Sequence, residues 1–252
     1  AGSDSSVGGV YTVAGGGAGL STGSNQDNFR YLYFPITNSA TCTLTARIVG
    51  MTGGATTARA GVMIRETTAN NSRHSSMLAE SAGAWRYIYR TSTNGNAATS
   101  TNTIIMKPYW VRLQRSGGTI RAFRSSNGST WVQNGVDQPM ALASEVLAGL
   151  AVSSRANTLL ARGTFDNVTM APPLPAGVAM EGRTVGFATD QGTESFDAGS
   201  GTWSVEGGGL GINVSSQDKC HFGAAPVTGD FTLTARVLGI SGGATTAQAL
   251  DA

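Results

Sequence analysis

The sequence is poor in charged residues, and its positive charge is spread thinly. Only 13% of the 252 residues are Asp, Glu, Lys or Arg, against about 25% in an ordinary globular domain. The formal net charge is +2, and Lys107 and Lys219 are the only lysines. The arginines stand singly along the chain and form no basic run. Nucleic-acid binding needs a concentrated basic face, so we expect no nucleic-acid partner.

Long apolar runs and cysteines are also scarce. No segment is long and apolar enough to predict a membrane-spanning helix. Cys42 and Cys220 are too few for a disulfide framework. Because they lie in different segments, a bridge between segments or chains and a pair of free buried thiols both stay open.

Glycine is abundant, with 35 residues, and Ser, Thr and Asn are common. This composition is typical of secreted or surface β-proteins. The chain begins at Ala1 with no basic and apolar leader. We therefore expect a processed protein that is extracellular or bound at the cell surface.

An internal repeat divides the chain. The segment TLTAR at 43–47 recurs at 232–236, and GGATTA at 53–58 recurs at 242–247 with the same spacing. A YTVAGGG segment before the first copy likewise matches a WSVEGGG segment before the second. Matching segments in the same order indicate a duplicated module.

The two copies differ in length. We predict a complete module at 1–171, a stiff Pro-rich linker at 172–177 and an incomplete second copy at 178–252. The second copy has equivalents of the opening strands but no match to GVMIRE at 61–66. An incomplete sheet exposes strand edges, which proteins normally cover. Three accounts stay open: the chain is a truncated piece of a longer tandem array, the fragment packs back on the first module, or another copy completes it by strand addition.

The first module has the pattern of strands throughout. Residues 85–90 and 109–114 alternate at a period of two, whereas 61–66 and 146–152 have the pattern of strands buried on both faces. Turn signals such as Asn127-Gly128 separate the runs. No segment has a sustained helical period. We therefore predict an all-β fold, an antiparallel β-sandwich of the jelly-roll type.

The order of motifs in the first module adds a family resemblance. The motifs are YTV at 11–13, DNFRYLY at 27–33, LTAR at 44–47, AGVMIRE at 60–66, SRH at 72–74, YWVRL at 109–113, RSSNGSTW at 124–131 and TFDNV at 164–168. This order resembles the concanavalin A-like lectin/glucanase superfamily, and within it a bacterial branch of laminin-G-like jelly-roll modules. The resemblance implies a concanavalin A-like sandwich. It implies no single function, because the superfamily holds lectins, glucanases, adhesion modules and inert spacers.

Catalytic clusters are not evident in the sequence. A retaining glycosidase needs two carboxyl groups about 5–5.5 Å apart, and only Glu66 and Glu80 would meet across neighbouring strands. We interpret Glu66 and Arg65 as ordinary polar groups at a strand end, and His74 as a residue that makes a structural hydrogen bond. The few His and Cys residues hardly supply the ligands of a catalytic zinc. We expect no catalytic residue, no metal and no cofactor.

The aromatic residues suggest where a ligand would bind. Trp85, Tyr87 and Tyr89 share one strand face, with Arg86 and Arg90 as outward residues of the same strand, and we therefore interpret the aromatic row as core. Trp110 and Arg112 lie on the face of their strand opposite to its apolar residues, and Trp131 follows a turn. We therefore predict Trp110, Arg112 and Trp131 as the ligand-binding residues.

Three functions are consistent with these features. The first is a non-catalytic extracellular repeat protein that assembles into an array, a homo-oligomer or a filament. The second is a carbohydrate-binding module of a larger secreted or cell-surface protein, with a glycan as its partner. The third and weakest is a β-glucanase.

Overall fold

The computed structural model describes residues 2–20, 23–37, 40–103, 109–175, 178–186, 192–197 and 202–207, together with Thr232, Arg236 and Leu238. The chain divides into two compact units, Ala1–Phe187 and Ala188–Ala252. Every regular element in the described ranges is a β-strand, which confirms the all-β prediction. The search of these residues for a helix long and apolar enough to cross a membrane finds none.

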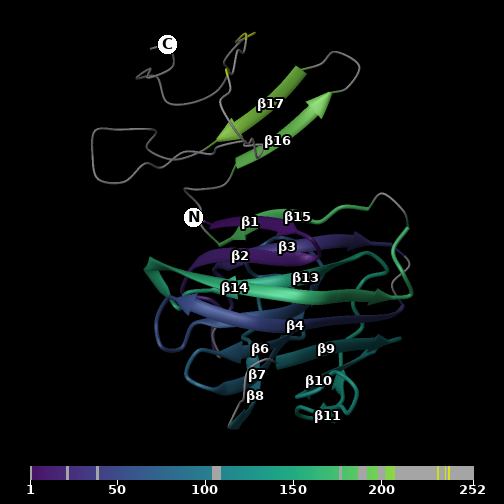
Figure 1. Ribbon diagram of the computed structural model, residues 1–252. Helices are drawn as coiled ribbons and strands as arrows, with labels where there is room; N and C mark the ends of the chain where they lie inside the picture. Colours follow the sequence, from purple (N-terminus) through teal and green to yellow (C-terminus); the bar gives the residue numbers. More distant parts are fainter. Residues whose placement is uncertain are drawn as a thin grey trace. The chain divides into compact units, whose positions relative to one another are not determined.

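The first unit is a sandwich of two antiparallel sheets (Figure 1). The eight-stranded sheet has the order β1-β2-β14-β4-β9-β10-β11, and β12 pairs with β10. Its strands are β1 (Gly2–Val7), β2 (Val10–Gly17), β4 (Thr41–Gly53), β9 (Tyr109–Ser116), β10 (Thr119–Ser125), β11 (Val132–Gln133), β12 (Gln138–Pro139) and β14 (Ala156–Ala171).

The seven-stranded sheet forms the second layer, in the order β15-β3-β13-β5-β6-β7-β8. Its strands are β3 (Phe29–Ile36), β5 (Arg59–Arg65), β6 (His74–Glu80), β7 (Ala84–Arg90), β8 (Ala98–Thr103), β13 (Val146–Ser153) and β15 (Glu181–Val185). Because consecutive strands often change layer, residues distant in sequence meet on each face.

The core lies between the sheets and follows the alternation of the strands. Tyr109, Val111 and Leu113 face inward from β9 and are buried. Trp85 and Tyr87 face them from β7, so the interpretation of this aromatic row as core is confirmed. Since successive side chains of a strand point to opposite faces, Trp110 and Arg112, which alternate with these core residues on β9, point outward.

The outer face of the seven-stranded sheet is also buried. Phe29, Tyr31, Met63, Leu78 and Ile88 form a second apolar cluster there. The turns and loops that precede β3 and β8 contribute further buried residues, Leu20 and Ala97. This cover explains why β5, β6 and β13 have little polar alternation, as expected for strands buried on both faces.

The boundary of the first unit differs from the predicted one. Residues 178–252 were assigned to the second copy, but β15 pairs with β3 at the edge of the seven-stranded sheet. Val185 is completely buried there, and the Tyr33 hydroxyl donates to Glu181 over 3.1 Å. The first unit therefore extends to Phe187, because the segment after the Pro-rich linker completes this edge.

The second unit contains a hairpin of β16 (Gly192–Asp197) and β17 (Thr202–Gly207). Gly207 pairs with Gly192, as Gly15 of the matching segment in the first copy pairs with Gly2. In each hairpin, the matching glycine of the repeated segment therefore lies opposite the first glycine of the preceding strand. The remaining strands expected for the second copy, and Cys220, lie outside the described residues.

Candidate functional site

The outer face of the eight-stranded sheet carries a group of polar and aromatic side chains. Strand register places Arg47 opposite Trp110, and Thr45 opposite Arg112, across β4 and β9. On the other side of β9, Phe123 of β10 is the partner of Arg112. The inward neighbours of these residues are buried core residues, so this group points away from the core.

Arg112 is held in place from two directions. Its Nε donates to the Thr45 hydroxyl over 3.1 Å. Its Cζ lies over the Trp131 ring, 3.7 Å from the ring centroid, within the range of a cation–π contact. The described residues provide no hydrogen-bond partner for its two terminal nitrogens. Burial lowers the pKa of Arg112 from its ordinary value.

Trp110 is packed on one side by a turn. A Cβ placed on Gly128 would come within 2.8 Å of the indole, and Gly128 has a positive φ of 75°. Glycine is therefore required for the turn and for its close approach to the ring. The Arg47 guanidinium lies 5.8 Å from the Trp110 ring centroid. Trp110 remains partly exposed between these two groups.

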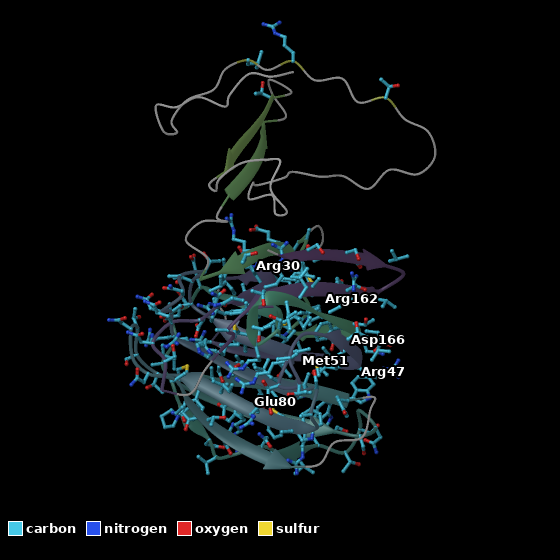
Figure 2. The ribbon with its side chains drawn as sticks, turned by 90° about the vertical axis from the view of Figure 1, so that its left-hand side faces the viewer. Arg30, Arg47, Met51, Glu80, Arg162 and Asp166 are labelled. Atoms are coloured by element: carbon cyan, nitrogen blue, oxygen red, sulfur yellow. The ribbon has the colours of Figure 1, made fainter. Side chains whose placement is uncertain are left out.

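The two arginines beside Arg112 are neutralised within the sheet. Arg47 forms a salt bridge with Asp166 of β14, and Figure 2 shows the two residues side by side. Arg121 of β10 forms a bidentate pair with Asp137, in which Nε donates to Oδ1 over 2.9 Å and a terminal nitrogen donates to Oδ2 over 2.6 Å. These hydrogen bonds raise the pKa of both arginines. Arg112 is flanked by ion pairs and has no carboxylate of its own among the described residues.

Uncharged hydrogen-bonding groups extend the site along β9 and β4. Gln114 lies on the same face as Arg112, two residues further along, and its register partner is Thr43. Both side chains are partly exposed, and within the described ranges neither has a hydrogen-bond partner. We call Thr43, Trp110, Arg112, Gln114 and Trp131 the outer-face site.

The structure brings together the three residues predicted as ligand-binding. Trp110 and Arg112 come from β9, and Trp131 reaches Arg112 from the loop between β10 and β11. The sequence reasoning missed Thr43, Thr45, Arg47 and Gln114. The TLTAR segment alternates polar and apolar side chains, and this period of two indicates that Thr43, Thr45 and Arg47 share the outer face of β4.

A second cluster of charged residues lies on the other sheet and is sealed from solvent. Asp27, Arg65, His74 and Arg90 have side chains that are 0% exposed. Both Asp27 oxygens accept hydrogen bonds from Arg90 over 2.7 Å. Arg65 donates to Asp27 over 3.3 Å. We call these four residues the buried charge cluster.

The arginines of the buried charge cluster also tie loops to the sheet. Arg65 donates to the carbonyl of Thr67 over 2.6 Å and to that of Ala69. Arg90 donates to the carbonyls of Gly95 over 2.7 Å and of Ser24 over 3.1 Å. Buried charges need such partners to offset their lost hydration, and these hydrogen bonds hold the loops against the sheet.

Three interpretations made from the sequence are corrected by this cluster. Arg65 does end β5, but it is a fully buried partner of Asp27 and not an ordinary polar group. Arg90 was taken as an outward residue of β7, yet loops cover that face. His74 makes no hydrogen bond through either ring nitrogen, and its nearest carboxylate contact is 3.8 Å, to Asp27. Burial lowers the pKa of His74 to about 3.

Glu66 and Glu80 do not form a pair. Arg65, next to Glu66, has His74 as its register partner, whereas Glu80 is opposite Arg59 at the other end of β5. Burial acts to raise the pKa of each glutamate, but hydrogen bonds from arginines hold both below the ordinary value. Arg73 binds Glu66, and Arg59 and Arg86 bind Glu80.

Metal ligands and thiols are sparse in the described part of the chain. It contains no group of three or more His, Cys, Asp or Glu residues placed to hold a metal ion. Cys42 is a buried free thiol in the core, and burial raises its pKa. Its position on an inward face of β4 is that of a small apolar core residue.

Comparison with known proteins supports the fold. No protein-family model matches the chain, and no curated protein matches it. A functionally unknown protein from Saccharomyces cerevisiae matches with a TM-score of 0.51 and 18% identity, over 69% of this chain and 93% of that one. The carbohydrate binding module CBM66 from Bacillus subtilis matches with a TM-score of 0.35 and 16% identity, over 66% and 84% of the two chains.

A GH43 protein from Bacillus licheniformis matches with a TM-score of 0.43 and 12% identity, over 59% of this chain. The match spans only 28% of that longer protein. The yeast protein shares the overall β-sandwich fold with this chain. This fold is jelly-roll-like, with two antiparallel sheets.

Proposed function

We propose that the chain is a non-catalytic carbohydrate-binding module whose glycan lies across the outer-face site. The observation that carries this proposal is the arrangement around Arg112. A guanidinium stacked on Trp131 and hydrogen-bonded to Thr45 keeps its terminal donors unused. Such a preorganised donor loses little conformational freedom on binding.

The chemistry of the neighbouring residues suits a sugar. Sugar hydroxyls both donate and accept hydrogen bonds, and Gln114 and Thr43 offer donors and acceptors next to the donors of Arg112. The C–H faces of a sugar ring are apolar and pack against aromatic side chains such as Trp110 and Trp131. A site on an open sheet face also suits an extended polymer better than a small molecule, which usually needs a deeper pocket.

The absence of catalysis is part of the proposal. A general acid for glycoside hydrolysis needs a raised carboxyl pKa, whereas arginines lower the pKa of Glu66 and Glu80. The other cluster of titratable groups, around Asp27, is sealed beneath loops. We also propose an extracellular or cell-surface location, where a module of this composition meets polysaccharides.

A glycan array tests the proposed function. The wild-type chain is compared with Trp131→Ala and Arg112→Gln, and with Arg162→Gln as a matched control. Arg162 is exposed on β14 and faces outward, because its neighbour Gly163 faces the core. We expect the wild type to bind a glycan on the array. Both site variants should bind this glycan more weakly, and the control should bind it as tightly as the wild type does. Failure of the wild type to bind any glycan would refute the proposal.

A structural role in a repeat array is the second candidate. The observation that favours it is the common register of the β1–β2 and β16–β17 hairpins. Light scattering over a range of concentrations tests this role, with a chain ending at residue 187 as the control. The full chain should associate and the shorter one should not; the same oligomeric state for both at all concentrations would exclude assembly through the second unit.

A further inference from the structure

We propose that the glycan is acidic and that Arg112 binds the carboxylate of a uronic-acid unit. This inference rests on the proposed carbohydrate-binding function and names the substrate class of the same site. Three features carry it: the local charge balance, the fixed orientation of the guanidinium, and the polar groups beside it.

The charge balance singles out Arg112. Arg47 and Arg121, on the strands that flank β9, are each paired with an aspartate. Arg112 lies between them, and the described residues give it no carboxylate partner. The outer-face site therefore carries one positive charge that nothing on the described surface cancels. A carboxylate is the simplest ligand group that would cancel it.

The burial of Arg112 strengthens this preference. Its side chain is partly withdrawn from water by Trp131 and by the strands on either side, and this desolvation lowers its pKa. A cation that has lost hydration without gaining a counter-ion gains more from an added anion than a fully hydrated cation does. Arg162, exposed on β14, has no such cover and provides the natural comparison.

The orientation of the guanidinium favours a planar carboxylate. Trp131 covers one face of the group, and Thr45 occupies Nε. The unused donors are then the two terminal nitrogens, and a guanidinium presents its donors as a planar fork that matches the two oxygens of a carboxylate. A point charge such as a lysine ammonium would provide the charge without this geometry.

The neighbouring groups place the sugar that carries the carboxylate. Gln114 follows Arg112 on the same face of β9, and Thr43 lies opposite Gln114 on β4. Along a strand, residues two apart are about 6–7 Å apart, which is close to the width of one sugar ring. A uronate bound to Arg112 would therefore bring ring hydroxyls within reach of Gln114 and Thr43.

Calorimetric titration with matched polysaccharides tests the proposal. The probes are polygalacturonate, alginate and hyaluronan, each compared with its carboxyl-reduced form, which retains the linkages but has lost the charge. Dextran sulfate serves as an anionic polymer without carboxylates. The proteins are the wild type, Arg112→Gln, Arg112→Lys and Arg162→Gln, with thermal unfolding as a check that each is folded.

We expect at least one uronate to bind the wild type at least tenfold more tightly than its reduced form does. Arg112→Gln should remove this preference, Arg112→Lys should restore only part of it, and Arg162→Gln should leave it unchanged. Equal affinity for charged and reduced forms, tighter binding of dextran sulfate than of every uronate, or an equal loss in Arg162→Gln would overturn the inference.

The two proposals fail in different ways. If the wild type binds charged and neutral glycans equally well at the outer-face site, the carbohydrate-binding function stands and the uronate assignment falls. If the wild type binds neither the charged nor the neutral polysaccharides in the titrations nor any glycan on the array, both fall.

Discussion

The guanidinium of Arg112 stacks on the indole of Trp131, with the Arg112 Cζ 3.7 Å from the ring centroid. The two residues come from different elements, β9 and the loop before β11, so the contact fixes the loop as well as the guanidinium. Cation–π contacts of this kind are worth about 0.5–2 kcal/mol. In the proposed function, the contact serves mainly to present the remaining donors of Arg112 to a ligand.

Substitution of Trp131 should separate binding from folding. We expect Trp131→Ala to lower the free energy of unfolding by only about 1 kcal/mol but to weaken glycan binding about tenfold or more, because Arg112 loses its support. Trp131→Phe should retain part of both. Chemical denaturation and calorimetric titration measure the two quantities. Unchanged binding by a folded Trp131→Ala variant would show that the stack has no part in recognition.

The buried charge cluster should matter far more for stability than an exposed ion pair. Asp27→Asn leaves Arg65 and Arg90 buried without a counter-charge, and breaking a buried pair in this way costs about 3–5 kcal/mol. Asp137→Asn breaks the exposed pair with Arg121 and should change stability little. Urea unfolding of the two variants measures the difference; similar effects would contradict the structural role of Asp27.

His74 should make the fold less stable as the pH falls. Above pH 6.5 the imidazole is neutral in both states and contributes nothing. Below it, the unfolded chain binds a proton, whereas the folded protein does not until the pH nears the pKa of about 3. Stability is therefore lost progressively over this window. Asp27, Arg65 and Arg90 face the ring.

The variant His74→Leu tests this dependence. Between pH 6.5 and pH 5 Glu66 and Glu80 remain ionised, since their pKa values are lowered. In this interval, the free energy of unfolding should fall less steeply with decreasing pH in the variant than in the wild type. Urea unfolding at several pH values measures the slope. Identical slopes in the two proteins would mean that His74 does not titrate differently on folding.

Truncation should locate the end of the first unit. A chain ending at Phe187 retains β15 and should unfold at nearly the temperature at which the first unit unfolds within the 252-residue chain. A chain ending at Ala171 loses β15 and the buried Val185, and should be less stable by at least about 2 kcal/mol. Thermal unfolding compares the two. Equal stability would restore the boundary at 171 that the sequence predicts.

The strand pattern predicted most of the fold because alternation reports directly on burial. Continuous burial of β5 and β13, and the inward row of Trp85 and Tyr87, follow from residue type and spacing. The position of β15 did not follow, because a short segment after a Pro-rich linker looks the same whether it ends one module or begins another. Only its pairing with β3 distinguishes the two.

The candidate site was predictable only in part. Alternation along β9 placed Trp110 and Arg112 on the face away from the core, but nothing in the sequence placed Trp131 over Arg112. That contact depends on the path of a loop. The same limit explains the error at Arg65 and Arg90, since alternation puts them on an outer face and cannot reveal that loops cover it.

The central claim is that a glycan binds the outer-face site. The most direct test is an NMR titration that follows the indole N–H signals of the tryptophans while a soluble oligosaccharide identified on the array is added. Trp110 and Trp131 lie at the site, whereas Trp85 is buried in the core. The proposal predicts that the signals of Trp110 and Trp131 shift with saturation and that of Trp85 does not. Saturable binding that leaves Trp110 and Trp131 unchanged would contradict it.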